Sequence, residues 1–220
     1  MRVLVVAVTL LGCKGGADQA AKDIAAEEAR SAEARRVNEK EMAPMRALEA
    51  RYEKSAIATI AAHTPKDGTA TIDLVKGRKI APILATKTYP DGEQRPLGKL
   101  WCRGRCDKQP LLAQDPADAG VLVIADVRIV DAGKWVSKGD LGQVKELGNA
   151  FIHEYDVRAV LVPEDIVVAR WRRYGFIPGI SNHELMPVKD EELTDDMMAI
   201  AQGRVPVEEG RPPKTDLGRY

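Results

Sequence analysis

Residues 120–130, GVLVIADVRIV, form the strongest β-strand signal in the chain. The segment opens with a glycine and is rich in valine and isoleucine, whose branched side chains suit a pleated and packed surface. This composition predicts a central strand of a β-sheet. The rest of the fold is expected to build on either side of it.

Two segments that precede this strand are predicted to form a hairpin. Residues 69–76 (TATIDLVK) and 79–89 (KIAPILATKTY) alternate or run apolar, and the turn residues 76–78 (Lys-Gly-Arg) lie between them. Residues 90–92 (Pro-Asp-Gly) predict the next turn. Because proline has no backbone N–H, Pro82 predicts that the second segment is an edge strand or carries a bulge.

The segment that follows the central strand, residues 137–155 (SKGDLGQVKELGNAFIHEY), is predicted to be a helix. Asp140 suits the N-cap position of such a helix. Apolar residues recur at helical spacing along one face, namely Leu141, Val144, Leu147, Phe151 and Tyr155.

Two further β-branched segments, residues 157–162 (VRAVLV) and 166–171 (IVVARW), suggest an antiparallel hairpin. Residues 163–165 (Pro-Glu-Asp) separate them, and the alternative is that this tripeptide starts a helix with acids in its first turn. A short acidic helix is predicted at 189–202 (KDEELTDDMMAIAQ). The Pro-rich remainder has too little apolar content to order itself.

The region before residue 66 is predicted to be helical in two pieces. Residues 17–42 consist largely of strong helix formers and contain neither proline nor glycine. Large apolar residues are too few for a coiled-coil seam, so a solvated, charged helical spacer is expected. Pro44 is expected to begin a second helix. The apolar stripe of that helix should pack on the domain and consists of Met45, Leu48, Tyr52, Ala56 and Ile60.

The chain begins MRVLVVAVTLLGCKGG, an apolar run that ends at a cysteine. As a helix, residues 3–11 would be about 14 Å long, far short of the roughly 30 Å of a hydrocarbon core. The segment Leu10-Leu11-Gly12-Cys13 resembles the lipobox of bacterial lipoproteins, in which a signal peptidase cleaves before a cysteine that is acylated. The alternative is a buried N-terminal strand with an incidental cysteine.

The resemblance covers only the first 13 residues and implies a place in the bacterial cell envelope. It implies cleavage before Cys13 and attachment to the membrane through lipid, palmitate included, on that cysteine. Lys14 rather than Asp follows the cysteine. By analogy with enteric bacteria, this favours the periplasmic face of the outer membrane over the inner membrane.

Together these elements predict an α+β fold, in which an N-terminal helical segment is followed by a mostly antiparallel sheet with one or two packed helices. The expected division of the chain is a signal peptide (1–12), a lipidated N-terminus and charged spacer (13–43), an amphipathic helix (44–65), a globular domain (66–188), and an acidic helix with a flexible Pro-rich tail (189–220).

Composition and cysteine usage narrow the function. Lys+Arg and Asp+Glu are equal at 33 each, so no net field draws the chain to nucleic acid, and no nucleic-acid partner is expected. Cys102 and Cys106, in WCRGRCD, predict a structural disulfide in an exported protein. A labile redox pair is one alternative, and metal binding or free thiols is the other. No cofactor is expected.

The sequence gives little evidence for catalytic residues, because no motif of a known nucleophile, zinc or nucleotide site occurs in the chain. His153-Glu154 is the best acid/base pair, since a carboxylate beside an imidazole raises its pKa. Adjacent residues on a helix point about 100° apart, however, so the two need not meet. His183-Glu184 is no stronger. No catalytic or metal-binding residue is therefore predicted.

Residues 170–174 combine guanidinium groups with two aromatic rings and form a candidate partner-binding patch for an envelope protein or a glycan. The patch consists of Arg170, Trp171, Arg172, Arg173 and Tyr174. The alternative is that Trp171 faces the core of an alternating strand while Arg170 and Arg172 point to water.

These patterns favour a lipid-anchored cell-envelope lipoprotein with a binding or structural role. An envelope assembly or chaperone factor is the alternative, and an envelope enzyme is the least favoured class. A cleft with titratable groups in contact would favour the enzyme, whereas an exposed apolar groove beside the helices would favour the assembly factor.

Overall fold

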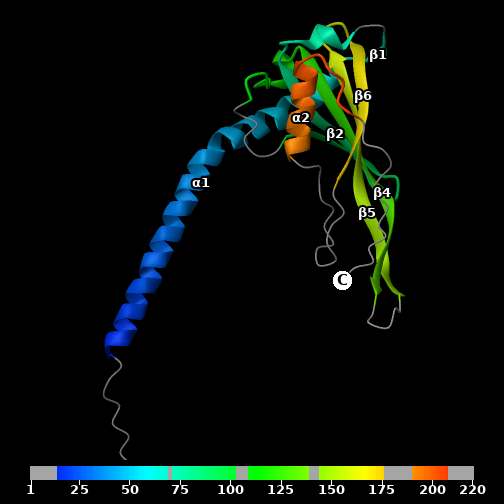
Figure 1. The fold of residues 1–220 in the computed structure, drawn as a ribbon. Helices are drawn as coiled ribbons and strands as arrows, with labels where there is room; N and C mark the ends of the chain where they lie inside the picture. Colours follow the sequence, from blue (N-terminus) through cyan, green and yellow to red (C-terminus); the bar gives the residue numbers. More distant parts are fainter. Residues whose placement is uncertain (1–13, 69–70, 103–108, 139–143, 176–189, 208–220) are drawn as a thin grey trace, which may run out of the picture. The chain divides into compact units, whose positions relative to one another are not determined.

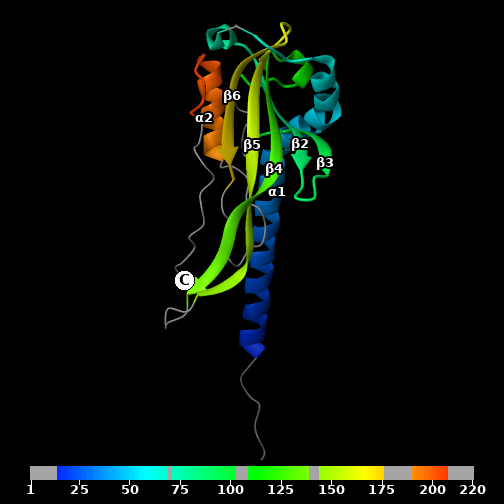
Figure 2. The same ribbon diagram turned by 90° about the vertical axis from the view of Figure 1, so that its right-hand side faces the viewer.

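Strand β4 (Val121–Lys138) contains residues 121–130 of the β-branched segment, and it lies inside a six-stranded sheet. The computed structural model describes residues 14–68, 71–102, 109–138, 144–175 and 190–207. The strand order is β1-β6-β5-β4-β2-β3. Figure 1 labels β1, and Figure 2 shows β6, β5, β4, β2 and β3 side by side in this order. The other strands are β1 (Lys66–Asp67), β2 (Ile80–Thr88), β3 (Gln94–Leu100), β5 (Val144–Leu161) and β6 (Ile166–Tyr174). The predicted central position of β4 is confirmed.

The α+β fold class is confirmed, but the sheet is mixed rather than mostly antiparallel. Strand β2 pairs with β4 in parallel, as does β1 with β6, whereas the other pairings are antiparallel. The parallel pairing arises because the chain returns after β3 to the start of β2. There the Ala113 amide donates to the Ile80 carbonyl at 2.9 Å, and the Gly120 amide donates to the Lys79 carbonyl at 2.9 Å. Strand β4 then begins beside Ile80 and runs in the same direction as β2.

The hairpin predicted for residues 69–89 is wrong, because its first segment is not a strand. Residues 69–70 lie outside the described residues, and Ile72–Val75 form a short 3-10 helix, η1. Only one of its large apolar side chains is fully buried: Val75 is inaccessible, whereas Leu74 is 50% exposed. The hairpin partner of β2 is instead β3, on the far side of the predicted turn at residues 90–92.

Pro82 does not mark an edge strand, because β2 lies between β4 and β3. The bulge of β2 occurs between Leu84 and Thr86 instead. In a strand, the backbone N–H and C=O groups of alternate residues point to the same neighbour. Those of Ile80 and Pro82 therefore both point away from β4. On that side the Pro82 carbonyl accepts from the Trp101 amide at 2.9 Å, while the ladder with β3 starts only at Ile83. The missing N–H is therefore tolerated in an interior strand.

The helix predicted for residues 137–155 is wrong where the structure describes the chain, because residues 144–155 belong to β5. Asp140 and Leu141 lie outside the described residues. Strand β4 continues to Lys138, and it pairs with β5 from Val121↔Leu161 to Lys138↔Val144. Residues 151 and 155 are four apart, a spacing that fits one face of a strand as well as one face of a helix. The partner strand decides between the two.

The hairpin predicted from residues 157–171 is confirmed as the antiparallel pair β5 and β6. The predicted acidic helix is confirmed as α2 (Asp190–Ala201). The expected flexible tail falls mostly on residues 208–220, which lie outside the described residues. A further short 3-10 helix, η3 (Pro116–Asp118), precedes β4.

One face of the sheet forms a core with α2. Alternate residues of β4, β5 and β6 point to this face and are buried, together with Leu193 and Ile200 of α2. The strand residues of this core include Val121, Val123, Val127, Tyr155, Val157 and Trp171. Beyond its neighbours, the β4–β5 ladder continues as a two-stranded hairpin, which both ribbon views show (Figures 1 and 2).

Helix α1 (Lys14–Ala62) contains Pro44 within its length, so the predicted start of a second helix at Pro44 is wrong. Proline removes one helical hydrogen bond, which the strong helix formers around it outweigh. The chain divides into two compact units, residues 1–44 and 45–220. In the first unit, the side chains of residues 22–41 are all exposed.

In the second unit, the stripe of α1 is buried. Met45, Leu48, Tyr52 and Ala56 are at most 2% exposed, while Ile60 is half-buried. The Tyr52 hydroxyl donates to the Ala113 carbonyl at 2.9 Å, which ties the helix to the segment before β4. Among the described helices, none is both long enough and apolar enough to cross a membrane.

Candidate functional site

The face of the sheet that points away from α2 carries a set of charged side chains on β4, β5 and β6. They occupy alternate positions over part of each strand, and alternate residues share a face. The intervening residues, such as Val127, Val157 and Trp171, belong to the core with α2. We call this set the charged face, and it consists of Asp126, Arg128, Glu154, Asp156, Arg158, Arg170 and Arg172.

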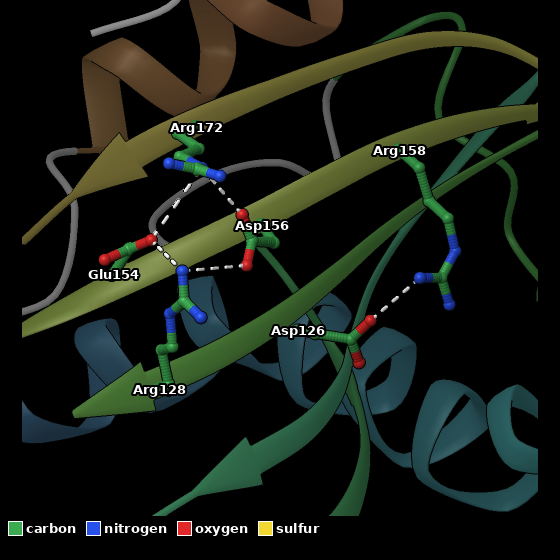
Figure 3. A network of polar contacts seen from close by, with 6 residues as sticks. All are labelled: Asp126, Arg128, Glu154, Asp156, Arg158 and Arg172. Carbon is green, nitrogen blue, oxygen red and sulfur yellow. Dashed lines mark hydrogen bonds and ion pairs between the residues drawn. The ribbon is translucent and has the colours of Figure 1, made fainter. Parts of the chain in front are cut away.

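Glu154 and Asp156 on β5 lie between an arginine of β4 and an arginine of β6 (Figure 3). Arg128 pairs with Glu154 and lies 3.4 Å from an Asp156 oxygen. Arg172 Nε lies 3.0 Å from Asp156 Oδ1 and 3.8 Å from Glu154 Oε1. The hydrogen bond to Glu154 raises the pKa of Arg128, and the hydrogen bond to Asp156 raises the pKa of Arg172. Glu154 itself is only 7% exposed, so it acts as the buried centre of this network.

A second pair lies further along β5. Arg158 Nη1 donates to Asp126 Oδ2 at 3.0 Å, and Thr86 of β2 donates to Asp126 Oδ1 at 2.6 Å. Arg158 is also directly opposite Arg170 of β6 in the strand register. Arg170 Nη2 donates to Asp67 Oδ1 of β1 at 2.7 Å. The two arginines therefore lie side by side, and each pairs with a carboxylate on a different strand.

These side chains surround a surface hollow of about 470 Å³ with mainly polar walls. Its lining includes Asp126, Asp156, Arg158, Arg170 and Arg172. The hollow is open to solvent, and it brings arginines from two strands next to carboxylates from two strands. Such a surface suits the recognition of charged groups by hydrogen bonds and ion pairs.

The five residues of the predicted patch do not form one surface, because strand β6 alternates. Arg170 and Arg172 are exposed on the charged face, whereas Trp171 and Arg173 are buried on the α2 side. There the Trp171 indole N–H and the Arg173 Nε–H both donate to Asp196 Oδ2 of α2 at 2.9 Å. The alternative interpretation, in which Trp171 faces the core, is confirmed. Tyr174, at the end of β6, is also buried.

His153 and Glu154 do not form an acid/base pair. Both lie on β5, where adjacent side chains point to opposite faces. The His153 ring lies near Tyr155, with Nδ1 3.5 Å from the Tyr155 hydroxyl. His183 and Glu184 lie outside the described residues. Within the described part of the chain, no cluster of His, Cys, Asp and Glu could hold a metal ion.

The predicted modification sites fall largely where the structure gives no description. Cys13 and Cys106 lie outside the described residues, whereas Cys102 is buried, with 5% of its surface exposed. The lipidation of Cys13 and the disulfide between Cys102 and Cys106 therefore stay predictions.

Sequence reasoning missed the charged face on β4 and β5. Its signal is the spacing of charges by two, in residues 126–128 (DVR) and 154–158 (EYDVR). That spacing is typical of the solvent face of a strand. The helical assignment of residues 137–155 concealed the part of the pattern that begins at Glu154, since charges two apart do not share a face of a helix.

The charged face consists of oppositely charged side chains in contact with one another. Each carboxylate in it is paired with a guanidinium group, and guanidinium groups stay protonated in proteins.

A separate hollow of about 230 Å³ lies between α2 and the start of β2 and is mainly apolar. Its walls include Ile80, Leu111, Leu112, Met197, Met198 and Ala201. Met198 is 44% exposed, so an apolar surface beside a helix is open to solvent here.

Comparison with known proteins gives no significant match to a family model, a curated protein or a solved structure.

Proposed function

We propose that this chain is a lipid-anchored lipoprotein of the bacterial cell envelope, and that its domain binds a partner through the charged face. The observation that carries the proposal is the segment Leu10-Leu11-Gly12-Cys13 after an apolar run of lipoprotein signal-peptide length. Lys14 favours the periplasmic face of the outer membrane. The partner is an envelope protein or an envelope glycan.

Two structural features support this proposal. The side chains of residues 22–41 are exposed, as a spacer between a lipid anchor and a folded domain requires. The charged face presents paired but solvent-accessible arginines around a polar hollow. Neither feature needs a catalytic group.

Replacement of Cys13 tests the anchor. Several acyl chains anchor a protein stably, at about 0.8 kcal/mol per buried CH₂, and only a thiol can carry the thioether-linked lipid. We expect Cys13→Ala to remain an uncleaved precursor without lipid, whereas the matched variant Lys14→Asp remains lipidated and moves toward the inner membrane. Intact-mass analysis of both proteins from separated membranes gives the answer. A wild-type protein that retains Met1 and carries no lipid mass would contradict the proposal.

A second candidate function, an envelope assembly or chaperone factor, is favoured by the apolar hollow beside α2. In this function the hollow would hold an apolar side chain of a partly folded envelope protein. We expect Met198→Glu to abolish protection of a denatured test protein against aggregation in light scattering, while the charged-face variant Arg172→Gln retains it. Equal protection by wild type and Met198→Glu would eliminate this candidate.

A further inference from the structure

Arg158 and Arg170 occupy directly opposed positions on β5 and β6. Like charges in such positions destabilise a sheet unless something compensates them. The compensation within the described residues is uneven. Arg158 pairs with Asp126, whereas Arg170 pairs with Asp67, whose side chain is 85% exposed. The Arg170 side chain is itself 60% exposed, so water screens its pair strongly.

The same place has more hydrogen-bond donors than acceptors. A guanidinium group has five N–H donors and no acceptor. The hollow is lined by three arginines, Arg158, Arg170 and Arg172, against two aspartates, Asp126 and Asp156. A ligand that supplies several acceptor oxygens would correct this imbalance.

We propose that the hollow on the charged face binds a phosphate-type dianion, with Arg158 and Arg170 on either side of it and Arg172 next to them. A phosphomonoester carries close to two negative charges and three acceptor oxygens, so it can bridge two opposed guanidinium groups. Asp126 and Asp156 stay on their own arginines and repel additional negative charge, which restricts the site to one such group. This inference adds a ligand class to the partners proposed above; it rests on the binding role of the charged face, but not on the lipid anchor.

The test is a calorimetric titration of the purified full chain, held in a mild neutral detergent, with inorganic phosphate and with glycerol phosphate. We expect saturable binding that weakens as sodium chloride is raised, because ion pairs at an exposed site are screened. Arg158→Gln and Arg170→Gln should each weaken binding about tenfold or more, the value of one charge-assisted hydrogen bond. Arg170→Gln changes an exposed side chain, so it keeps the test valid where Arg158→Gln impairs folding.

Arg95→Gln is the matched control. Arg95 is an exposed arginine on strand β3 of the same sheet and pairs with Glu93, at 2.8 Å between Nε and Oε1, away from the hollow. Its replacement should leave phosphate affinity unchanged. The absence of saturable binding, or equal weakening by Arg95→Gln and Arg170→Gln, would overturn the proposal.

A second arm distinguishes the source of the phosphate group. Micelles of the same detergent doped with phosphatidic acid present the group on a lipid headgroup. If the ligand is a lipid headgroup, binding to these micelles should be at least tenfold tighter than binding to glycerol phosphate. If the ligand is soluble, the two affinities should be similar. Either result supports the site, provided that Arg170→Gln weakens the binding. A chain that is lipidated at Cys13 yet binds neither probe would refute the phosphate site alone, since the mass analysis of Cys13 tests the anchor separately.

Discussion

At the scale of single residues, Tyr52 shows how one polar group stabilises the contact between α1 and the rest of the domain. Its ring is fully buried, and its hydroxyl donates to the Ala113 carbonyl. Burial raises the pKa of Tyr52 well above its usual value near 10, and the nearby charge of Asp115 raises it further. The folded state therefore retains the neutral phenol where the unfolded chain loses its proton.

The sign of the resulting pH dependence follows from this difference. The contribution of Tyr52 is complete below a pH of about 10, the unfolded value, and is lost as the pH rises above it. While the folded phenol stays protonated, the loss is about 1.4 kcal/mol per pH unit for one group. We therefore expect alkaline destabilisation of the domain above a pH of about 10.

Tyr52→Phe tests this dependence. Near a pH of about 8 the variant should be less stable by about 1 kcal/mol, because the Ala113 carbonyl loses its donor. Phenylalanine cannot ionise, so the difference should shrink or reverse near a pH of about 11. Urea unfolding followed by tryptophan fluorescence at the two pH values measures both quantities. A difference that is constant or grows with pH would show that Tyr52 does not control the alkaline response.

At the scale of elements, Asp196 links α2 to the sheet by hydrogen bonds. It is 4% exposed, and it accepts hydrogen bonds from Trp171 and from Arg173 of β6. The Arg173 side chain is only 10% exposed, and it pairs with this carboxylate and also donates from Nη1 to the Val207 carbonyl at 2.7 Å. The adjacent Asp195 is exposed to solvent.

Asp196→Ala should lower the free energy of unfolding by about 3 kcal/mol, because it leaves a buried guanidinium and a buried indole N–H without the carboxylate. Asp195→Ala is the matched control and should change stability by no more than about 0.5 kcal/mol. Chemical denaturation of the two variants beside the wild type gives these values. Equal losses in both would mean that α2 needs acidic charge in general rather than this contact.

At the scale of the whole molecule, the division at residue 44 predicts which parts of the chain the domain needs. The side chains of residues 22–41 are exposed, whereas Met45, Leu48 and Tyr52 are at most 2% exposed. Burial of a large apolar side chain contributes about 1.5–3 kcal/mol. The N-terminal half of α1 should therefore be dispensable for stability, and its C-terminal half should not.

A protein that begins at Ala43 should melt within about 2–4 °C of one that begins at Lys14, since a loss near 1 kcal/mol shifts the midpoint by that amount. A protein that begins at Lys66 should melt far lower or fail to fold, because it lacks the buried stripe of α1. Thermal unfolding followed by circular dichroism compares the three. If the protein that begins at Ala43 fails to fold, or the protein that begins at Lys66 melts like the longest one, the boundary between spacer and domain does not lie at Pro44.

Local patterns in the sequence predict those helices and strands whose buried and exposed residues follow a regular spacing or composition. The run 120–130 has few polar side chains and is the interior strand β4, and the alternation of residues 166–171 correctly places Trp171 inward and Arg170 outward. The acidic helix α2 also follows from its composition. In these cases the residues that decide the structure lie within one short segment.

Where a local pattern fits more than one structure, pairing with a strand far away in the chain decides which structure forms. The four-residue spacing of Phe151 and Tyr155 fits both a helix and a strand, and pairing with β4, which continues to Lys138, makes residues 144–155 a strand. The charged face appears only when the register aligns Asp126 with Asp156, and Asp156 with Arg172. The sequence by itself thus determined the central strand, the acidic helix and the lipobox-like segment, and it left the two sides of β6 as one of two interpretations. Only the tertiary structure decided the mixed sheet and the arginine-lined hollow, because backbone hydrogen bonds between distant strands set which side chains become neighbours.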